Sequence, residues 1–192
     1  MPKCKYCTSS QLSHSTLKEY TDDLLGAPFK VTLIDSVEQH SCMQCKKVFG
    51  HKVPNLQGLY AAIAILRVVN PTKLNGAEIR FLRRCVGWKA NELAKKLTVT
   101  AEHLSRCENG HKAMGEGHER LLRLYIVVEM IDRLNDLPVS PEQLKELNSI
   151  KFNPIRDVQN PIAFFLKLET CEECSEEKEP KWEDAPSELI AA

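Results

Sequence analysis

The sequence predicts an α+β chain, in which a small β-rich segment precedes an all-helical segment and an acidic C-terminal extension. Residues 29–33 alternate apolar and polar side chains, the period of a half-buried strand. Apolar side chains in residues 56–69 recur instead at helical spacing, and short helical patterns continue to about residue 134. Charge changes along the same boundaries: residues 1–66 carry 7 basic and 5 acidic side chains, residues 67–125 carry 12 and 6, and residues 126–192 carry 7 and 15.

Length and composition exclude several classes of protein. The 192 residues suffice for one or two domains, and an apolar content of 43% supports a buried core. The 26 basic and 26 acidic side chains cancel, which excludes a uniformly basic, histone-like chain. Because the sequence has no apolar stretch of about 18 residues and no apolar run behind its first residues, we expect a cytoplasmic protein without a membrane span.

Four of the eight cysteines form two pairs with metal-binding spacing, Cys4-x-x-Cys7 and Cys42-x-x-Cys45. Two thiolates separated by two residues can reach one ion from a tight turn, and a second such turn completes a tetrahedron. Strand-like stretches at 12–20 and 29–40 can form the hairpin that brings the turns together. We therefore expect one structural Zn²⁺ per chain, because four protein ligands leave no position for water.

Iron in the same cysteine cage, as in rubredoxin-like electron carriers, is the alternative metal. Such carriers usually place glycine after the second cysteine of each pair, where this chain has Thr8 and Lys46. That difference favours zinc, although spacing alone does not choose the metal.

The remaining cysteines carry weaker signals. Cys85 and Cys107 lie at helical core spacings and are expected to act as small apolar residues. Cys171 and Cys174 form a third pair without a partner pair, and flanking glutamates disfavour their thiolates. Their role stays open, between incidental thiols and a metal shared across a dimer.

Start and stop signals divide the helical segment. Asn70-Pro71 ends the first helix, Asn75 can cap the next with Glu78 at its third position, and Gly87 can end it. Thr100 can cap a further helix that reaches Asn109-Gly110. The last helix starts near Gly117, and we expect its buried face to be apolar, formed by Leu121, Leu124, Tyr125, Val128, Ile131 and Leu134.

Residues 93–106 have the spacing of a helix-turn-helix, with Ala94 small enough for close packing of the two helices. Leu97, Val99 and Leu104 are expected to fill the space between them. The second helix then presents an outer face formed by Ala101, Glu102, Ser105, Arg106 and Asn109. Such a helix can enter the DNA major groove, where arginine offers a bidentate pair of hydrogen bonds to guanine.

On these residues Asn75–Met130 resembles an XRE-type (lambda-repressor-like) helix-turn-helix domain. The matching stretches are Glu78-Ile79-Arg80-x-Leu82-Arg83, Glu92-Leu93-Ala94 and Leu104-Ser105-Arg106-x-Glu108-Asn109-Gly110. With the cysteine pairs in front of it, the chain to about residue 130 resembles the MqsA-like (YgiT-type zinc finger) antitoxins. The resemblance implies a zinc domain that holds a protein toxin, a domain that binds the double-stranded operator DNA of its own operon, and a homodimer.

The same resemblance assigns roles to single side chains. It places Glu102 and Arg106 at base-reading positions. It places Thr100, Asn109 and Lys112 at positions that contact the DNA backbone. Lys89 and His103 complete the candidate set of DNA-contacting residues.

Five parts are therefore expected. They are a zinc-binding ribbon (1–54), a linking helix (55–72), an XRE-type helix-turn-helix domain (73–137), a dimerisation or partner-docking segment (138–168) and an acidic, disordered tail (169–192). The apolar run 162–168 either packs on the chain's own helices or docks another protomer, a toxin or a chaperone. An acidic tail can also compete with DNA for a basic surface.

These signals predict a zinc-containing transcriptional repressor, the antitoxin of a toxin–antitoxin system, and not an enzyme. No nucleophile–base pair, phosphate-cradling glycine loop or open metal site stands out in the sequence. Two alternatives remain: a zinc-ribbon adaptor that binds proteins and not DNA, and the rubredoxin-like electron carrier.

Overall fold

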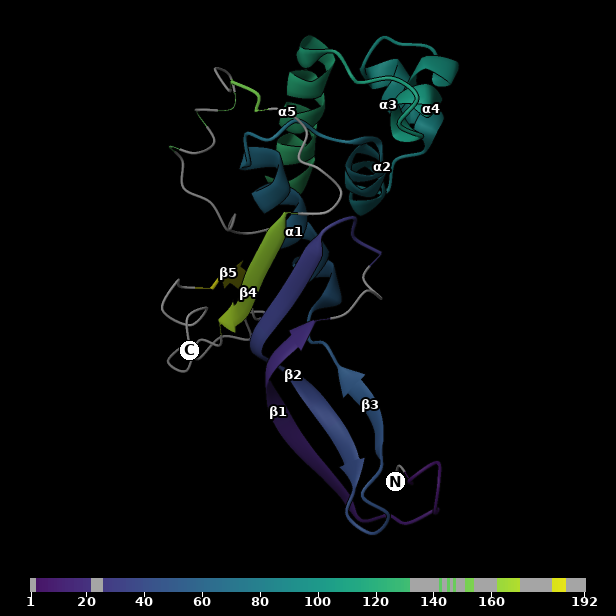
Figure 1. Cartoon of the computed structure of the whole chain (residues 1–192), viewed down its shortest axis with the longest axis vertical. Coiled ribbons are helices and arrows are strands. Elements are labelled where there is room, and N and C mark those ends of the chain that lie inside the picture. The colour runs from purple at the N-terminus through teal and green to yellow at the C-terminus, as the bar shows by residue number, and fades with distance from the viewer. Residues whose placement is uncertain are drawn as a thin grey trace. The chain divides into compact units, whose positions relative to one another are not determined.

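The computed structural model describes residues 3–21, 26–131, 142, 145, 147, 151–153, 162–169 and 181–185, and these form a mixed α+β fold, as predicted (Figure 1). The strands are β1 (Leu12–Thr21), β2 (Lys30–Cys42), β3 (Val48–Lys52), β4 (Ala163–Glu169) and β5 (Lys181–Asp184). The helices are α1 (Leu56–Val69), α2 (Gly76–Cys85), α3 (Ala90–Lys96), α4 (Ala101–Glu108) and α5 (Glu116–Ile131). The described residues divide into a sheet unit, which lies within 1–22, 31–56 and 164–192, and a helical unit within 23–30 and 57–163.

The sheet unit is built on the long strand β2. Strand β1 pairs antiparallel with it, from Leu12 opposite Cys42 to Thr21 opposite Thr32, so the predicted hairpin is confirmed. An extra residue in β2 shifts the register near Asp35, whose φ of 46° is left-handed, as in a β-bulge. On the other edge of β2, β3 pairs antiparallel with Glu38–Ser41. The core of this sheet includes Val31, Leu33, Ile34 and Val37, each at most 3% exposed.

The C-terminal segment adds two strands to the same sheet, in the order β1-β2-β4-β5. The N–H of Lys30 donates to the carbonyl of Ile162 (3.2 Å), and the N–H of Leu168 donates to Ser36 Oγ (2.9 Å). In both contacts the two residues are 132 positions apart in the sequence, so β4 runs parallel to β2. The apolar run 162–168 is therefore a strand of this sheet.

Strand β5 lies within residues 169–192, which were expected to be largely disordered. Lys181–Ala185 are ordered, and Trp182 lies opposite Leu168 in an antiparallel pair with β4. The indole of Trp182 is 3% exposed, and its Nε1–H donates to the carbonyl of Asn55 (3.0 Å). The acidic composition around Trp182 suggested disorder, because the mean composition of a segment does not reveal one large apolar side chain that drives its packing.

Helix α1 is buried on all sides. Side chains on every face of this helix are buried, among them Leu59, Ile63, Ile65 and Val68, each fully inaccessible. A helix that is apolar all round belongs in a core, so the expected linking helix is a core element of the helical unit. The predicted caps are also present: Asn75 and Glu78 form a reciprocal capping box at the start of α2.

Two arginines are fully buried beside the loop that joins α1 to α2. Arg67 on α1 forms a bidentate ion pair with Glu78 (2.9 and 2.8 Å). Arg123 on α5 donates to Glu119 Oε1 (2.8 Å) and to the carbonyl of Thr72 (2.8 Å). Charge inside the core thus fixes the path of residues 70–74 relative to both helices.

The buried face of α5 is not the predicted one. Leu121, Val128 and Ile131 are 40%, 59% and 50% exposed, and Leu134 lies outside the described residues. The face that packs inward carries instead Glu119, Leu122, Arg123, Ile126, Val127 and Met130. Apolar periodicity did not identify this face, because two of its positions hold the charged residues Glu119 and Arg123. A search for apolar residues passes over such positions.

Close backbone packing between α2 and α4 requires glycine at position 76. A Cβ added there would clash with the carbonyl oxygen of Cys107 and would lie 2.7 Å from that of Glu108. We expect Gly76→Ala to destabilise the helical unit by about 1–3 kcal/mol, because the main chains must separate. Denaturant unfolding followed by Trp88 fluorescence measures this loss.

The matched control is Gly117→Ala on α5, where an added Cβ meets nothing within 4 Å. That change should be neutral or stabilising by up to about 1 kcal/mol, because alanine is the better helix former. Equal stability of the two variants would contradict the packing described here.

Candidate functional site

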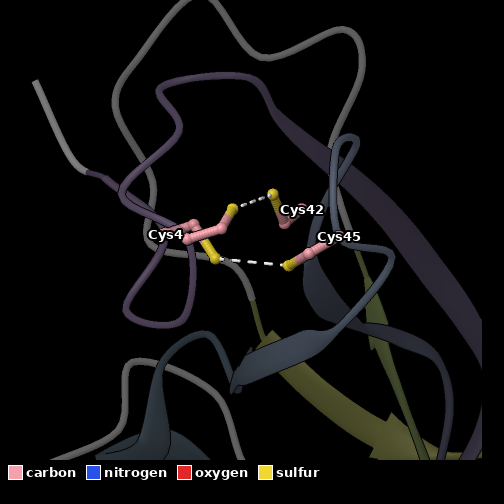
Figure 2. Close-up of side chains that lie close together, drawn as sticks. Cys4, Cys42 and Cys45 are labelled. Atoms are coloured by element: carbon pink, nitrogen blue, oxygen red, sulfur yellow. Dashed lines mark hydrogen bonds between the residues drawn. The ribbon is translucent and has the colours of Figure 1, made fainter.

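Four thiols converge where the two ends of the β1–β2 hairpin meet. Cys4 and Cys7 precede β1, Cys42 is the last residue of β2, and Cys45 lies in the turn before β3. Their sulfur atoms all lie within 4.8 Å of one another, with 3.7 Å between Cys4 and Cys45 and 3.5 Å between Cys7 and Cys42. Figure 2 shows Cys4 facing Cys42 and Cys45 from the opposite turn. Among the described residues this is the one cluster that fits a metal ion, and it contains the four predicted ligands.

The two cysteine turns have the same backbone geometry. Each is closed by two hydrogen bonds, Thr8 N–H to Cys4 O (2.9 Å) with Cys4 N–H to Ser9 O (2.8 Å), and Lys46 N–H to Cys42 O (2.9 Å) with Cys42 N–H to Lys47 O (3.0 Å). Thr8 and Lys46 both have a φ of 58°, the left-handed conformation that glycine adopts most readily. The missing glycines therefore do not separate zinc from iron, because the turns take the glycine-like conformation without them.

Backbone N–H groups and burial set the charge of the cluster. The N–H groups of Cys45 and, less strongly, Gln44 lower the pKa of Cys42 to about 6, against the effect of burial. The N–H of Ser9 also lowers the pKa of Cys7, but burial and the neighbouring thiol of Cys42 raise it to about 12. The surroundings of Cys42 thus favour its thiolate, and those of Cys7 favour its thiol. A divalent cation would stabilise all four thiolates, so this donor set fits such an ion.

The candidate DNA-contacting residues lie on and around α4. All five residues of the predicted outer face are exposed, while Leu97 and Leu104 are fully buried and Val99 is half-buried. Lys89 and Lys112 are exposed, and His103 is half-buried with its ring 6.4 Å from that of His118. Six of the seven candidates thus lie on α4 or within four residues of its ends, and Lys89 precedes α3.

Their side chains differ in how far they are already engaged. Thr100 caps α4, since its Oγ1 accepts a hydrogen bond from the N–H of His103 (3.1 Å). Asn109 accepts a hydrogen bond from the guanidinium of Arg80 and donates one to Ser105 Oγ (3.3 Å). The guanidinium of Arg106 makes no hydrogen bond or ion pair with any residue that the structure describes. Of these three side chains, Arg106 is the one available to an external ligand.

A buried ion pair between α4 and α2 was not predicted. Glu108 is 7% exposed, and its carboxylate accepts hydrogen bonds from Arg83 Nε (2.6 Å) and Nη2 (3.0 Å). Arg80 lies 3.6 Å from the same carboxylate. The stretches Glu78–Arg83 and Leu104–Gly110, which carry the resemblance, are thus joined through this contact. An i-to-i+25 pairing leaves no local pattern in a sequence.

Three buried ion pairs account for part of the charge of residues 67–125. Glu78, Glu108 and Glu119 are all buried and pair with Arg67, Arg83 and Arg123. Of the 12 basic and 6 acidic side chains in residues 67–125, nine basic and three acidic ones remain outside these pairs. The basic excess of this segment is therefore carried outside the buried pairs.

Comparison of the chain with protein-family models, with curated proteins and with solved structures finds no match. Within the described ranges, no helix has the length and hydropathy needed to cross a lipid bilayer.

Proposed function

We propose that the chain is a zinc-containing, DNA-binding transcriptional regulator, in which α3 and α4 form a helix-turn-helix. The observation that carries the proposal is α4 itself, whose inner side is buried while its outer side presents Glu102 and an unpaired Arg106. In a helix-turn-helix the second helix enters the major groove, where its outward-facing side chains contact base edges.

The connection between the two helices supports this assignment. Four residues, 97–100, join α3 to α4, and Thr98 adopts a left-handed φ of 54° in that sharp turn. Arg106 offers a bidentate pair of hydrogen bonds to guanine, and Glu102 can accept one from the amino group of cytosine. These are the side-chain types that read base edges directly.

The basic excess of residues 67–125 supplies a second argument. Lysines and arginines that neutralise DNA phosphates release bound counterions, which provides most of the sequence-independent affinity. The nine basic and three acidic side chains outside the buried pairs suit that role. The adaptor alternative would need no such excess.

Zinc is the proposed metal and its role is structural. Four thiolates complete a tetrahedron and leave no open position, which is typical of zinc sites that stabilise folds. The purified chain should be colourless and hold one zinc ion. A red protein that contains iron would contradict this assignment and support the electron carrier.

The roles as repressor, antitoxin and homodimer rest on the resemblance described above. Under this proposal the chain binds the operator of its own operon, and a toxin encoded beside it binds the chain. Co-expression with the neighbouring gene product should yield a stable complex that contains both proteins. Independent migration of the two proteins would contradict the antitoxin role.

Arg106→Ala should abolish sequence-specific DNA binding. One lost bidentate contact costs about 1–3 kcal/mol of discrimination against the wrong base. Titration of a duplex from the chain's own promoter and of a scrambled duplex at fixed salt concentration measures the preference. We expect the promoter duplex to lose its advantage.

Arg84→Ala is the matched control, since Arg84 is an exposed arginine on α2 and the change in charge is the same. It should weaken binding to both duplexes by a similar small factor and preserve the preference for the promoter. An Arg106→Ala variant that still prefers the promoter as strongly as Arg84→Ala does would contradict the assignment of α4.

A further inference from the structure

The end of the sheet unit that holds the cysteines is strongly basic. Residues 3–18 and 39–52 contain six lysines and no aspartate or glutamate. Four of these lysines, Lys3, Lys5, Lys46 and Lys47, flank the cysteine ligands, and all four are exposed. We call these four lysines, together with Tyr6, the lysine tip.

Tyr6 orders two lysines that come from different turns. Its ring is 51% exposed, and the ammonium groups of Lys5 and Lys47 lie 5.1 and 4.9 Å from the ring centroid. These are cation–π contacts, which hold otherwise flexible side chains in place. Lys5 belongs to the first cysteine turn and Lys47 follows the second, so the convergence of the two turns brings the pair together. Preorganisation reduces the entropy lost when an anion binds.

The charges of the tip are not neutralised within the part of the chain that the structure describes. None of its four lysines forms an ion pair with a described residue, whereas Lys52, farther along β3, lies 3.8 Å from Glu38. The positive charge of the tip is therefore available to an anionic partner.

We infer that the lysine tip binds the phosphodiester backbone of DNA, without regard to base sequence. All the cations here are lysines, which act as point charges on phosphates, whereas the sequence has no arginine before Arg67. Interfaces between proteins are depleted in lysine and enriched in arginine, so an acidic protein is a poorer fit. A membrane is also a poorer fit, because insertion of the Tyr6 ring would carry both ammonium groups into the apolar layer.

This inference does not depend on α4, because the tip and α4 belong to different units of the chain. The tip should contribute equally to the binding of every duplex. The proposed helix-turn-helix should contribute to the preference among duplexes.

The test is the double variant Lys5→Gln/Lys47→Gln in the full, zinc-loaded chain. Its binding to two unrelated duplexes is measured over a range of salt concentrations. We expect both affinities to fall by the same factor. The plot of log affinity against log salt concentration should become less steep by about 1.8, as for the loss of two phosphate contacts. Lys5→Arg/Lys47→Arg keeps the charges and should retain the full slope.

Lys18→Gln/Lys52→Gln is the matched control, because it removes two exposed lysines of the same unit outside the tip and should leave the slope unchanged. Repeating the measurements in the Arg106→Ala background separates the two proposals: the tip effect should persist there. An unchanged slope in Lys5→Gln/Lys47→Gln would overturn the inference. The inference would also be overturned if Lys5→Gln/Lys47→Gln lost binding to anionic lipid vesicles and kept its full affinity for DNA.

Discussion

Serine in place of Cys42 should release the metal and unfold the end of the sheet unit that holds the two cysteine turns. Cys42 is 1% exposed, and its sulfur lies 3.5 Å from that of Cys7. Structural zinc contributes about 10–16 kcal/mol in small zinc-dependent folds, and a hydroxyl does not replace a thiolate ligand. Metal content should therefore fall from one ion per chain towards zero.

Hydrogen exchange locates the consequence along the chain. Amides of the two turns, including those of Tyr6, Thr8 and Lys46, should lose protection because the hydrogen bonds they donate depend on the turn geometry. The helical unit has its own core and should keep its protection. A chelator added to the natural chain should reproduce this pattern.

Cys85→Ser is the control for this prediction. It makes the same chemical change at a half-buried cysteine of α2, outside the cluster. Metal content should remain at one ion per chain. Full metal occupancy in the Cys42→Ser variant would show that the four thiols do not form the site.

Arg123→Met should cause the largest loss of stability in the helical unit. The change leaves the buried carboxylate of Glu119 without its cation, and one oxygen of that carboxylate, Oε2, already has no hydrogen-bond partner among the described residues. It also leaves the carbonyls of Val68, Asn70 and Thr72 without the donors that Arg123 supplies. Removal of one partner of a buried ion pair costs about 3–5 kcal/mol.

The two tryptophans allow each unit to be followed separately. Trp88 belongs to the helical unit and Trp182 to the sheet unit. In Arg123→Met, the transition reported by Trp88 should shift to lower denaturant concentration, and the transition reported by Trp182 should shift less. A Trp182→Phe background isolates the first signal.

Arg84→Met is the control, because Arg84 is exposed and its loss should change stability by no more than about 0.5 kcal/mol. The double variant Arg123→Met/Glu119→Leu should recover part of the loss, because it leaves no unpaired charge in the core. An Arg123→Met variant as stable as Arg84→Met would contradict the buried network.

Local patterns in the sequence were sufficient for the metal cluster and for most element boundaries. The Cys-x-x-Cys spacing is a property of one turn, and the caps at Asn75 and Thr100 involve residues three apart in sequence. These features depend on neighbouring residues, so they can be recognised without the fold. The predicted convergence of the four cysteines and the predicted start of α4 were confirmed for that reason.

Features that join distant parts of the chain were not predicted. The contact between Glu108 and Arg83 and the pairing of β4 with β2 involve residues 25 and 132 positions apart. The buried face of α5 was wrong because Arg123 is satisfied by carbonyls near residue 70, which makes a charged side chain a core residue. Apolar periodicity carries no information about such partners.

Selection of DNA from a pool of random duplexes tests the central claim most directly. The zinc-loaded full chain is used at about 0.15 M salt, where nonspecific contacts are strongly screened. The account predicts enrichment of one motif, arranged as an inverted repeat with half-sites about 10 base pairs apart if two copies bind together. Bound duplexes with the same composition as the starting pool would contradict it.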